Sequence, residues 1–109
     1  MAIFALKVDV IPRRRTEFVQ TAAEIIERIQ REDENIEARL YQDMADPDSL
    51  LILTEWKTPV SLERHMESDY FKALRWAVSE MADSRLMILE CGVEFDKTWS
   101  PETEVQGLG

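Results

Sequence analysis

The chain has 109 residues, the usual length of one domain, and its 45% hydrophobic and 32% charged residues are typical of a folded domain and not of a disordered chain. Its acidic residues outnumber its basic ones, 22 to 13, which leaves a formal net charge of −9 and excludes strong attraction to nucleic-acid phosphates or anionic lipid. No stretch approaches the roughly 20 apolar residues that cross a bilayer, and no signal-peptide pattern is present, so we expect a cytoplasmic protein with neither nucleic acid nor a membrane as partner.

A strand and a helix are predicted first. Polar and apolar side chains alternate along residues 2–11, which predicts a strand that Pro12 ends. From Thr16 onward apolar residues recur at helical spacing, and we expect Thr16 to cap a helix that reaches about residue 32. The apolar face of this helix consists of Phe18, Ala22, Ile25, Ile26 and Ile29. The arginine run at residues 13–15 is interpreted as a solvated turn, with anion binding as the alternative.

A hairpin of two strands follows the helix. Residues 36–43 alternate again and are separated by the turn signal at residues 46–48 from a third strand over residues 50–57. The third strand is apolar on both faces at first and ends with Glu55 and Trp56 on opposite faces. The predicted apolar face of the second strand includes Ile36, Ala38 and Leu40.

Two helical segments and a last strand complete the pattern. The pair Thr58-Pro59 predicts the capped start of a short helix that runs to about residue 67. Ser68 is then expected to cap a longer helix. The apolar face of this longer helix consists of Phe71, Leu74, Val78, Met81 and Ala82. Residues 85–95 are predicted to form the last strand, which contains the single cysteine of the chain; one cysteine excludes an internal disulfide and fits a reducing compartment.

The order β-α-β-β-α-β over residues 1–96 predicts an α+β domain of ferredoxin-like fold. Its sheet would have four antiparallel strands, with the helices on one face. The third strand is apolar on both faces, so the second face of the sheet also needs a cover, and an identical subunit is the simplest one. We therefore expect a homodimer that forms a dimeric α/β barrel. The C-terminal tail, residues 97–109, shows no period; its Trp99 is expected to dock on the partner subunit, with simple exposure as the alternative.

Three short motifs lie in and after the third predicted strand. They are LILTEWK at residues 51–57, LERHM at residues 62–66 and SDYF at residues 68–71. This series resembles the antibiotic-biosynthesis-monooxygenase family, in which a strand ending in Trp leads into a short helix with a His and then a Ser/Thr-x-x-Phe step. The resemblance extends from the first strand to Phe95. It implies a dimeric α/β barrel with a pocket between sheet and helices in each subunit.

The only histidine, His65, lies at the edge of the apolar side of the short helix. As a functional group it is the candidate catalytic base, because its ordinary pKa near neutrality suits the removal of a phenolic or enolic proton. As a structural group it would bind Glu55 or a backbone carbonyl and tie the helix to the third strand. The structural interpretation is favoured, because a semi-buried imidazole usually has such a partner.

Five further residues are candidates for binding a small aromatic or apolar molecule. They are Tyr41, Trp56, Tyr70, Phe71 and Arg75. The tyrosine hydroxyls would orient an aromatic ligand, and Arg75, beside the apolar stripe of the longer helix, would bind an oxyanion. Core packing is the alternative for Trp56 and Phe71, and extension into water is the alternative for Arg75.

The sequence predicts neither a metal site nor a cofactor. One histidine, one cysteine and scattered carboxylates lack the ligand spacing of a zinc or iron centre, and three glycines exclude a glycine-rich phosphate loop. Haem-degrading members of the resembled family use an Asn, a Trp and a His. The resemblance places Lys7 or a neighbour, His65 and Arg75 at those positions, so we do not expect haem degradation.

The leading hypothesis is a cofactor-independent monooxygenase that acts on a small aromatic or quinol-type substrate in the pocket between sheet and helices. Family members of this kind oxidise aromatic polyketides and quinols without metal or flavin, whereas others act on small signal molecules or have no known activity. Membership therefore does not name a reaction. The alternative is a non-catalytic dimeric module that binds a small ligand or has a structural role, in which the same residues only pack.

Overall fold

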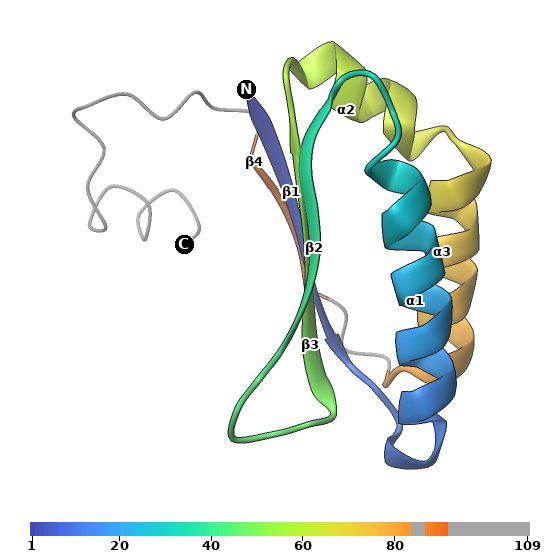
Figure 1. Ribbon diagram of the computed structural model, residues 1–109. Coiled ribbons are helices and arrows are strands. Elements are labelled where there is room, and N and C mark those ends of the chain that lie inside the picture. The colour runs from blue at the N-terminus through green and yellow to red at the C-terminus, as the bar shows by residue number, and fades with distance from the viewer. Residues whose placement is uncertain (84–86, 92–109) are drawn as a thin grey trace.

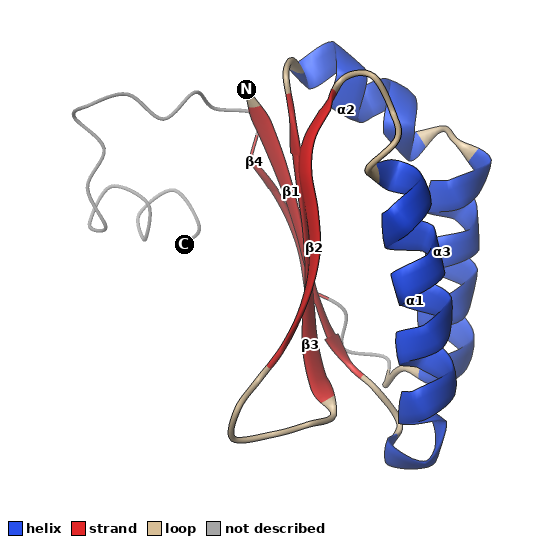
Figure 2. Cartoon of the chain, in the orientation of Figure 1, coloured by secondary structure: helices blue, strands red, loops and turns tan. Residues whose placement is uncertain are grey.

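The computed structural model describes residues 1–83 and 87–91 and contains two layers, a sheet and a set of helices that cover one of its faces (Figures 1 and 2). The strands are β1 (Ala2–Asp9), β2 (Asn35–Gln42), β3 (Ser49–Trp56) and β4 (Met87–Cys91), in the order β2-β3-β1-β4, and each neighbouring pair is antiparallel. The α+β ferredoxin-like fold is thus confirmed. Residues 85–86 and 92–95 of the predicted last strand and the predicted tail, residues 97–109 with Trp99, lie outside the described residues.

The helices are α1 (Arg15–Ile29), α2 (Pro59–Met66) and α3 (Asp69–Met81), with α1 and α3 side by side along the sheet and α2 at the end where β3 finishes (Figure 1). All five residues predicted for the apolar face of α1 are buried. They pack with the buried residues of α3 and with every second residue of β1. The α3 residues are Phe71, Leu74, Ala77, Val78 and Met81. The apolar faces that the sequence periods predict for the helices and for β1 therefore pack together in one core between the two layers.

The entrance to α1 differs from the prediction. A 3-10 turn, Pro12–Arg14, precedes the helix, and Arg14 occupies the N-cap position without a side-chain cap bond. The predicted cap at Thr16 is wrong, because the fixed φ of Pro12 starts helical winding earlier and leaves Thr16 inside the first turn. The helix also ends at Ile29, three residues before the predicted end, and this places Glu32 in the connection to β2.

A β-bulge between Asn35 and Glu37 changes the start of β2. Ile36, predicted on the apolar face, is 49% exposed, because the extra residue shifts the side-chain alternation at this point. Asn35 instead pairs with Trp56, and its side-chain amide donates hydrogen bonds to the carbonyl oxygens of Glu37 and Glu55 at 3.1 and 3.2 Å. The bulge thus joins the α1–β2 connection to the end of β3.

Candidate functional site

The short helix α2 carries His65 into the core. The side chain of Thr58 accepts a hydrogen bond from the backbone amide of Ser61 at 3.1 Å, and the Ser61 side chain accepts one from the backbone amide of Thr58 at 3.1 Å, so a capping box fixes the start of the helix. The predicted caps at Thr58 and Ser68 are both confirmed. Two helical turns after the cap, His65 is 3% exposed.

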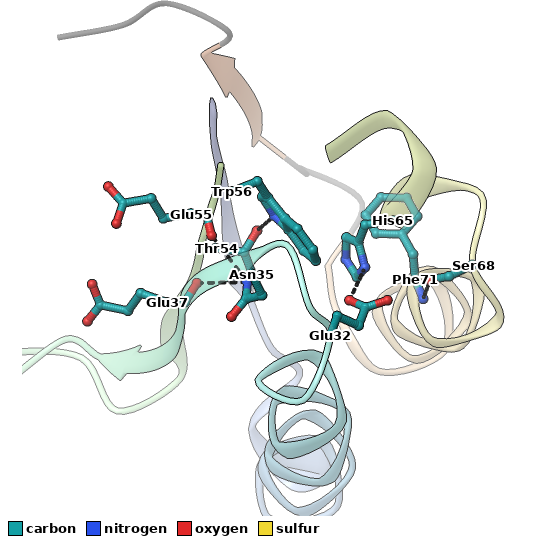
Figure 3. A network of polar contacts seen from close by, with 9 residues as sticks. All are labelled: Glu32, Asn35, Glu37, Thr54, Glu55, Trp56, His65, Ser68 and Phe71. Atoms are coloured by element: carbon teal, nitrogen blue, oxygen red, sulfur yellow. Dashed lines mark hydrogen bonds and ion pairs between the residues drawn. The ribbon is translucent and has the colours of Figure 1, made fainter. Parts of the chain in front are cut away.

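Aromatic side chains hold the imidazole of His65 on two sides (Figure 3). The indole of Trp56 stacks on it with ring centroids 4.4 Å apart and an interplanar angle of 26°. The ring of Phe71 meets it edge-on at 5.5 Å and 73°. Trp56 is itself fixed, because it is 1% exposed and its Nε1 donates a hydrogen bond to Thr54 Oγ1 at 3.0 Å. The imidazole therefore has little freedom to rotate.

Glu32 supplies the polar contact of the imidazole. Its Oε2 lies 3.0 Å from His65 Nδ1, and neither of these buried atoms has a hydrogen-bond partner elsewhere in residues 1–83 and 87–91 (Figure 3). The prediction that Glu55 would be the partner is wrong: Glu55 is half-buried and points away from His65, on the face of β3 opposite to Trp56. The prediction that Glu55 and Trp56 occupy opposite faces is confirmed.

Burial shifts the proton affinities of both members of this pair. It lowers the pKa of His65 from 6.5 to about 4, because the imidazolium loses its hydration in the aromatic surroundings. Burial also raises the pKa of Glu32, which has 29% of its side chain exposed. At neutral pH the imidazole is therefore uncharged, and one of its ring nitrogens is free to accept a proton.

A pocket of about 380 Å³ opens beside the pair, within the size range of small-molecule sites. Its lining combines the Trp56–His65 stack with a polar and charged rim, made of Arg31, Glu32, Asp33, Glu34, Ser61, Arg64 and Ser68. A second hollow of about 270 Å³ shares Arg31 and Glu32 with it and adds Arg28 and Tyr70. The site thus lies at one end of the molecule, where the α1–β2 connection faces α2.

The structure brings together some of the predicted site residues. Trp56 and His65 line the first pocket, and Phe71 lies buried against His65. Tyr70 lines the second hollow, where its hydroxyl accepts a hydrogen bond from Arg28 at 3.4 Å and its ring lies 5.6 Å from the guanidinium.

Two predicted substrate-binding residues lie elsewhere. Tyr41 is 46% exposed on β2, with its partner Leu51 on the sheet face away from the helices. Arg75 is exposed on α3. Neither lines the two hollows described above, so these hollows could not use them to orient a ligand.

Sequence reasoning missed the charged lining of the pocket, above all Glu32. In the sequence, residue 32 was singled out only as the approximate end of the first predicted helix. Glu32 and His65 are 33 positions apart, so no local period joins them. The sequence did contain one usable signal, the short connection between α1 and β2. A short connection keeps residue 32 close to the end of the sheet from which α2 also starts.

A ferredoxin-like sheet covered by helices on one face, with a pocket at its end, places the chain in the class of small α+β domains of ferredoxin-like fold. The sequence model of the antibiotic biosynthesis monooxygenase family matches residues 1–76, and the chain belongs to this family. A Bacillus subtilis (strain 168) protein named "Putative monooxygenase YcnE" is 22% identical over 72 residues, which are 66% of this chain and 76% of that protein.

Solved structures share the fold. A conserved protein from Methanosarcina mazei Go1 is 32% identical, with a TM-score of 0.77 over 86% of this chain and 94% of its own. An antibiotic biosynthesis monooxygenase from Nitrosomonas europaea, so named with the qualifier "Putative", is 18% identical, with a TM-score of 0.79 over 87% of this chain and all of its own. The second likeness supports the fold alone.

The described residues hold neither a metal-binding cluster nor a membrane-spanning helix. Within residues 1–83 and 87–91, no three His, Cys, Asp or Glu side chains gather closely enough to bind a metal ion. In the same part of the chain, no helix is long and apolar enough to cross a bilayer.

Proposed function

We propose that the chain is a monooxygenase that uses no metal or organic cofactor and oxidises a small aromatic or quinol-type molecule in the pocket beside His65. One observation carries this proposal: a buried, neutral imidazole borders a pocket of about 380 Å³ in a chain of this family. A base in a site of low hydration suits chemistry that begins with removal of a phenolic proton.

The electron balance restricts the substrate class. When one oxygen atom of O₂ enters the substrate and the other leaves as water, O₂ accepts four electrons in total. Without a cofactor the substrate must supply all four, two by forming the new carbon–oxygen bond and two by its oxidation to a quinone or ketone. Quinols and phenols with an activated ring carbon meet this requirement once they are deprotonated.

The residues of the site take separate roles in this proposal. His65 accepts the proton, and Trp56 fixes the imidazole and excludes water from one of its faces. Arg31 and Arg64, at the rim of the pocket, are suited to attract the resulting anion. Tyr41 and Arg75 take no part, because they do not line the pocket.

Oxygen consumption tests the proposal directly. Purified protein treated with a metal chelator is mixed with a panel of quinols and polyketide-like phenols, and dissolved O₂ is followed with an electrode. We expect uptake of one O₂ per substrate oxidised for at least one compound of the panel. Binding of panel compounds without any O₂ uptake would contradict the proposal.

The alternative function, a non-catalytic ligand-binding module, draws on the same geometry. His65 is almost fully buried, stacked on Trp56 and in contact with Glu32, as expected for a residue that ties helix α2 to the sheet. In that case the pocket would bind its ligand unchanged. Ligand binding together with an unaltered oxygen concentration would favour this function.

We further propose that the chain forms a homodimer through the sheet face that the helices leave open. Leu53 lies half-buried at the centre of this face, with Ala5 of β1 on one side and Arg39 of β2 on the other. Leu51 is next to it on the same face. In the part of the chain that the structure describes, helices cover the opposite face only (Figure 2), so an identical sheet is the simplest cover for these leucines.

Leu53→Asp is expected to convert the dimer into monomers, because it would bury two uncompensated carboxylates in the proposed interface. Light scattering at micromolar concentration should return the mass of two chains for the wild type and of one chain for this variant. Val60→Asp is the matched control, since Val60 is an exposed apolar residue on α2, away from this face. A wild-type mass of one chain would contradict the proposed dimer.

A further inference from the structure

We infer that Glu32 is a positioning residue of the site: its carboxylate holds the hydrogen of the neutral His65 imidazole on Nδ1 and so leaves Nε2 as the atom that accepts the proton of the substrate. The catalytic part of this inference rests on the proposed function. The tautomer itself does not, and it can be measured without a substrate.

The first step is that both side chains are held where they meet. The backbone of Glu32 donates a hydrogen bond to the carbonyl of Ile29 and accepts one from the amide of Asn35, each at 3.0 Å. Asn35 in turn is tied to β3 through the carbonyl of Glu55. The imidazole is packed between Trp56 and Phe71. The contact between Glu32 Oε2 and His65 Nδ1, 3.0 Å apart, therefore links the α1–β2 connection to α2, and both side chains are held in place.

The second step concerns hydrogen-bonding capacity. An ionised carboxylate only accepts hydrogen bonds, and a neutral imidazole has one N–H donor and one acceptor nitrogen. If the hydrogen were on Nε2, two acceptors would face each other at 3.0 Å, both buried and both without another partner in the described residues. A hydrogen on Nδ1 satisfies both atoms, so the contact selects this tautomer.

The third step concerns the charges around the imidazole. Arg31 and Asp33 also line the pocket from the α1–β2 connection, as does Glu34, and Arg64 lines it from α2. On the β3 and α3 sides the imidazole meets the uncharged rings of Trp56 and Phe71. The carboxylate of Glu32 is the charged group that the structure places at contact distance from the ring.

The chemical consequence follows when a substrate enters. The O–H bond of a phenol breaks, an N–H bond forms at Nε2, and the imidazolium so produced lies 3.0 Å from the Glu32 carboxylate. The opposite charge offsets part of the loss of hydration that disfavours a buried imidazolium. The division of work is the one found between Asp and His in hydrolase triads, where the carboxylate orients the ring and stabilises its cationic form.

Nitrogen-15 NMR of the full chain with labelled histidine tests this inference. His65 is the only histidine, so a single pair of ring-nitrogen signals appears and needs no assignment to a residue; couplings to the ring protons distinguish Nδ1 from Nε2. Near neutral pH we expect Nδ1 to be protonated and Nε2 to be unprotonated. In Glu32→Ala the population should shift to the Nε2–H tautomer, which histidine prefers in water, whereas Asp33→Ala removes a neighbouring charge of the same pocket and should leave the signals unchanged.

A wild-type spectrum of the Nε2–H tautomer would overturn the inference, and so would a Glu32→Ala spectrum with the wild-type tautomer. The wild-type measurement decides by itself if Glu32→Ala does not fold. A purely structural role of Glu32 would change stability without moving the ring hydrogen. An Nδ1–H tautomer in a protein that consumes no oxygen would keep the assignment of Glu32 and reject the proposed monooxygenase.

Discussion

Replacing His65 by alanine should slow oxygen consumption by about 10²- to 10⁴-fold for any quinol or phenol that the wild-type protein oxidises, the range usual for the loss of a general base. The reason is that the substrate transfers electrons to O₂ only as an anion, and without the imidazole the pocket loses the neutral base that contacts Trp56 and Glu32. The rate is measured with an oxygen electrode at saturating substrate, so that kcat is separated from KM.

Two further variants make this result specific. His65→Gln keeps a polar side chain of similar length but supplies no base, and it should be as slow as His65→Ala. Glu63→Ala changes an exposed residue of the same helix and should react at the wild-type rate. If His65→Ala and His65→Gln kept both kcat and ligand affinity, His65 would have only the structural role.

The second large effect is a change of the unfolding free energy with pH. We expect the share of the unfolding free energy that depends on His65 to fall by up to about 3 kcal/mol as the pH decreases from about 6.5 to about 4. The cause is the burial that lowers the pKa of His65 to about 4 in the folded chain, from an ordinary value of 6.5. The side chain is 2% exposed, so solvent screens this effect very little.

The sign of this pH dependence follows from the number of protons that the folded and unfolded chains bind at His65. Between these two pH values the unfolded chain binds a proton at His65 and the folded chain does not, so acid favours unfolding, and the stability supplied by the neutral imidazole is complete only above about pH 6.5. Glu32 acts in the opposite direction: because burial raises its pKa, the folded state takes up a proton before the unfolded state does, and stability is lost as the pH rises through the folded pKa.

Urea unfolding of the wild type and of His65→Gln at a series of pH values isolates the contribution of His65. The 22 Asp and Glu residues of the chain titrate in both proteins, and their contributions largely cancel in the difference between the two unfolding free energies. The difference should increase with pH between about 4 and 6.5 and stay constant above. A difference that does not change with pH would mean that the imidazole keeps its ordinary pKa in the folded chain.

Much of the fold could be predicted from local patterns. The helical period of α1 identified its buried face, because a helix on a sheet buries one stripe. The strand period separated Trp56 from Glu55, and the capping residues Thr58 and Ser68 located the starts of α2 and α3. Where local geometry competed, the prediction failed: Pro12 moved the start of α1, and the bulge at Asn35 turned Ile36 outward.

The candidate site was predictable only in part. The sequence singled out His65 as the candidate base, and Trp56 and Phe71 as candidates for ligand binding or core packing, and the structure brings these three together. It could not exclude Tyr41, because alternation along β2 does not tell which face the helices cover. It also could not find the pairing of Glu32 with His65, which depends on the path of the α1–β2 connection.

The amino-acid sequence by itself determined the order of the elements and the buried face of α1, because the spacing of neighbouring residues sets both. Its motifs resembled the family to which the chain belongs. Only the tertiary structure decided that a carboxylate from the α1–β2 connection meets the imidazole of α2 at 3.0 Å. The physical reason is that a contact between residues 32 and 65 arises from packing two layers on one core, and packing constrains side chains that no local period relates.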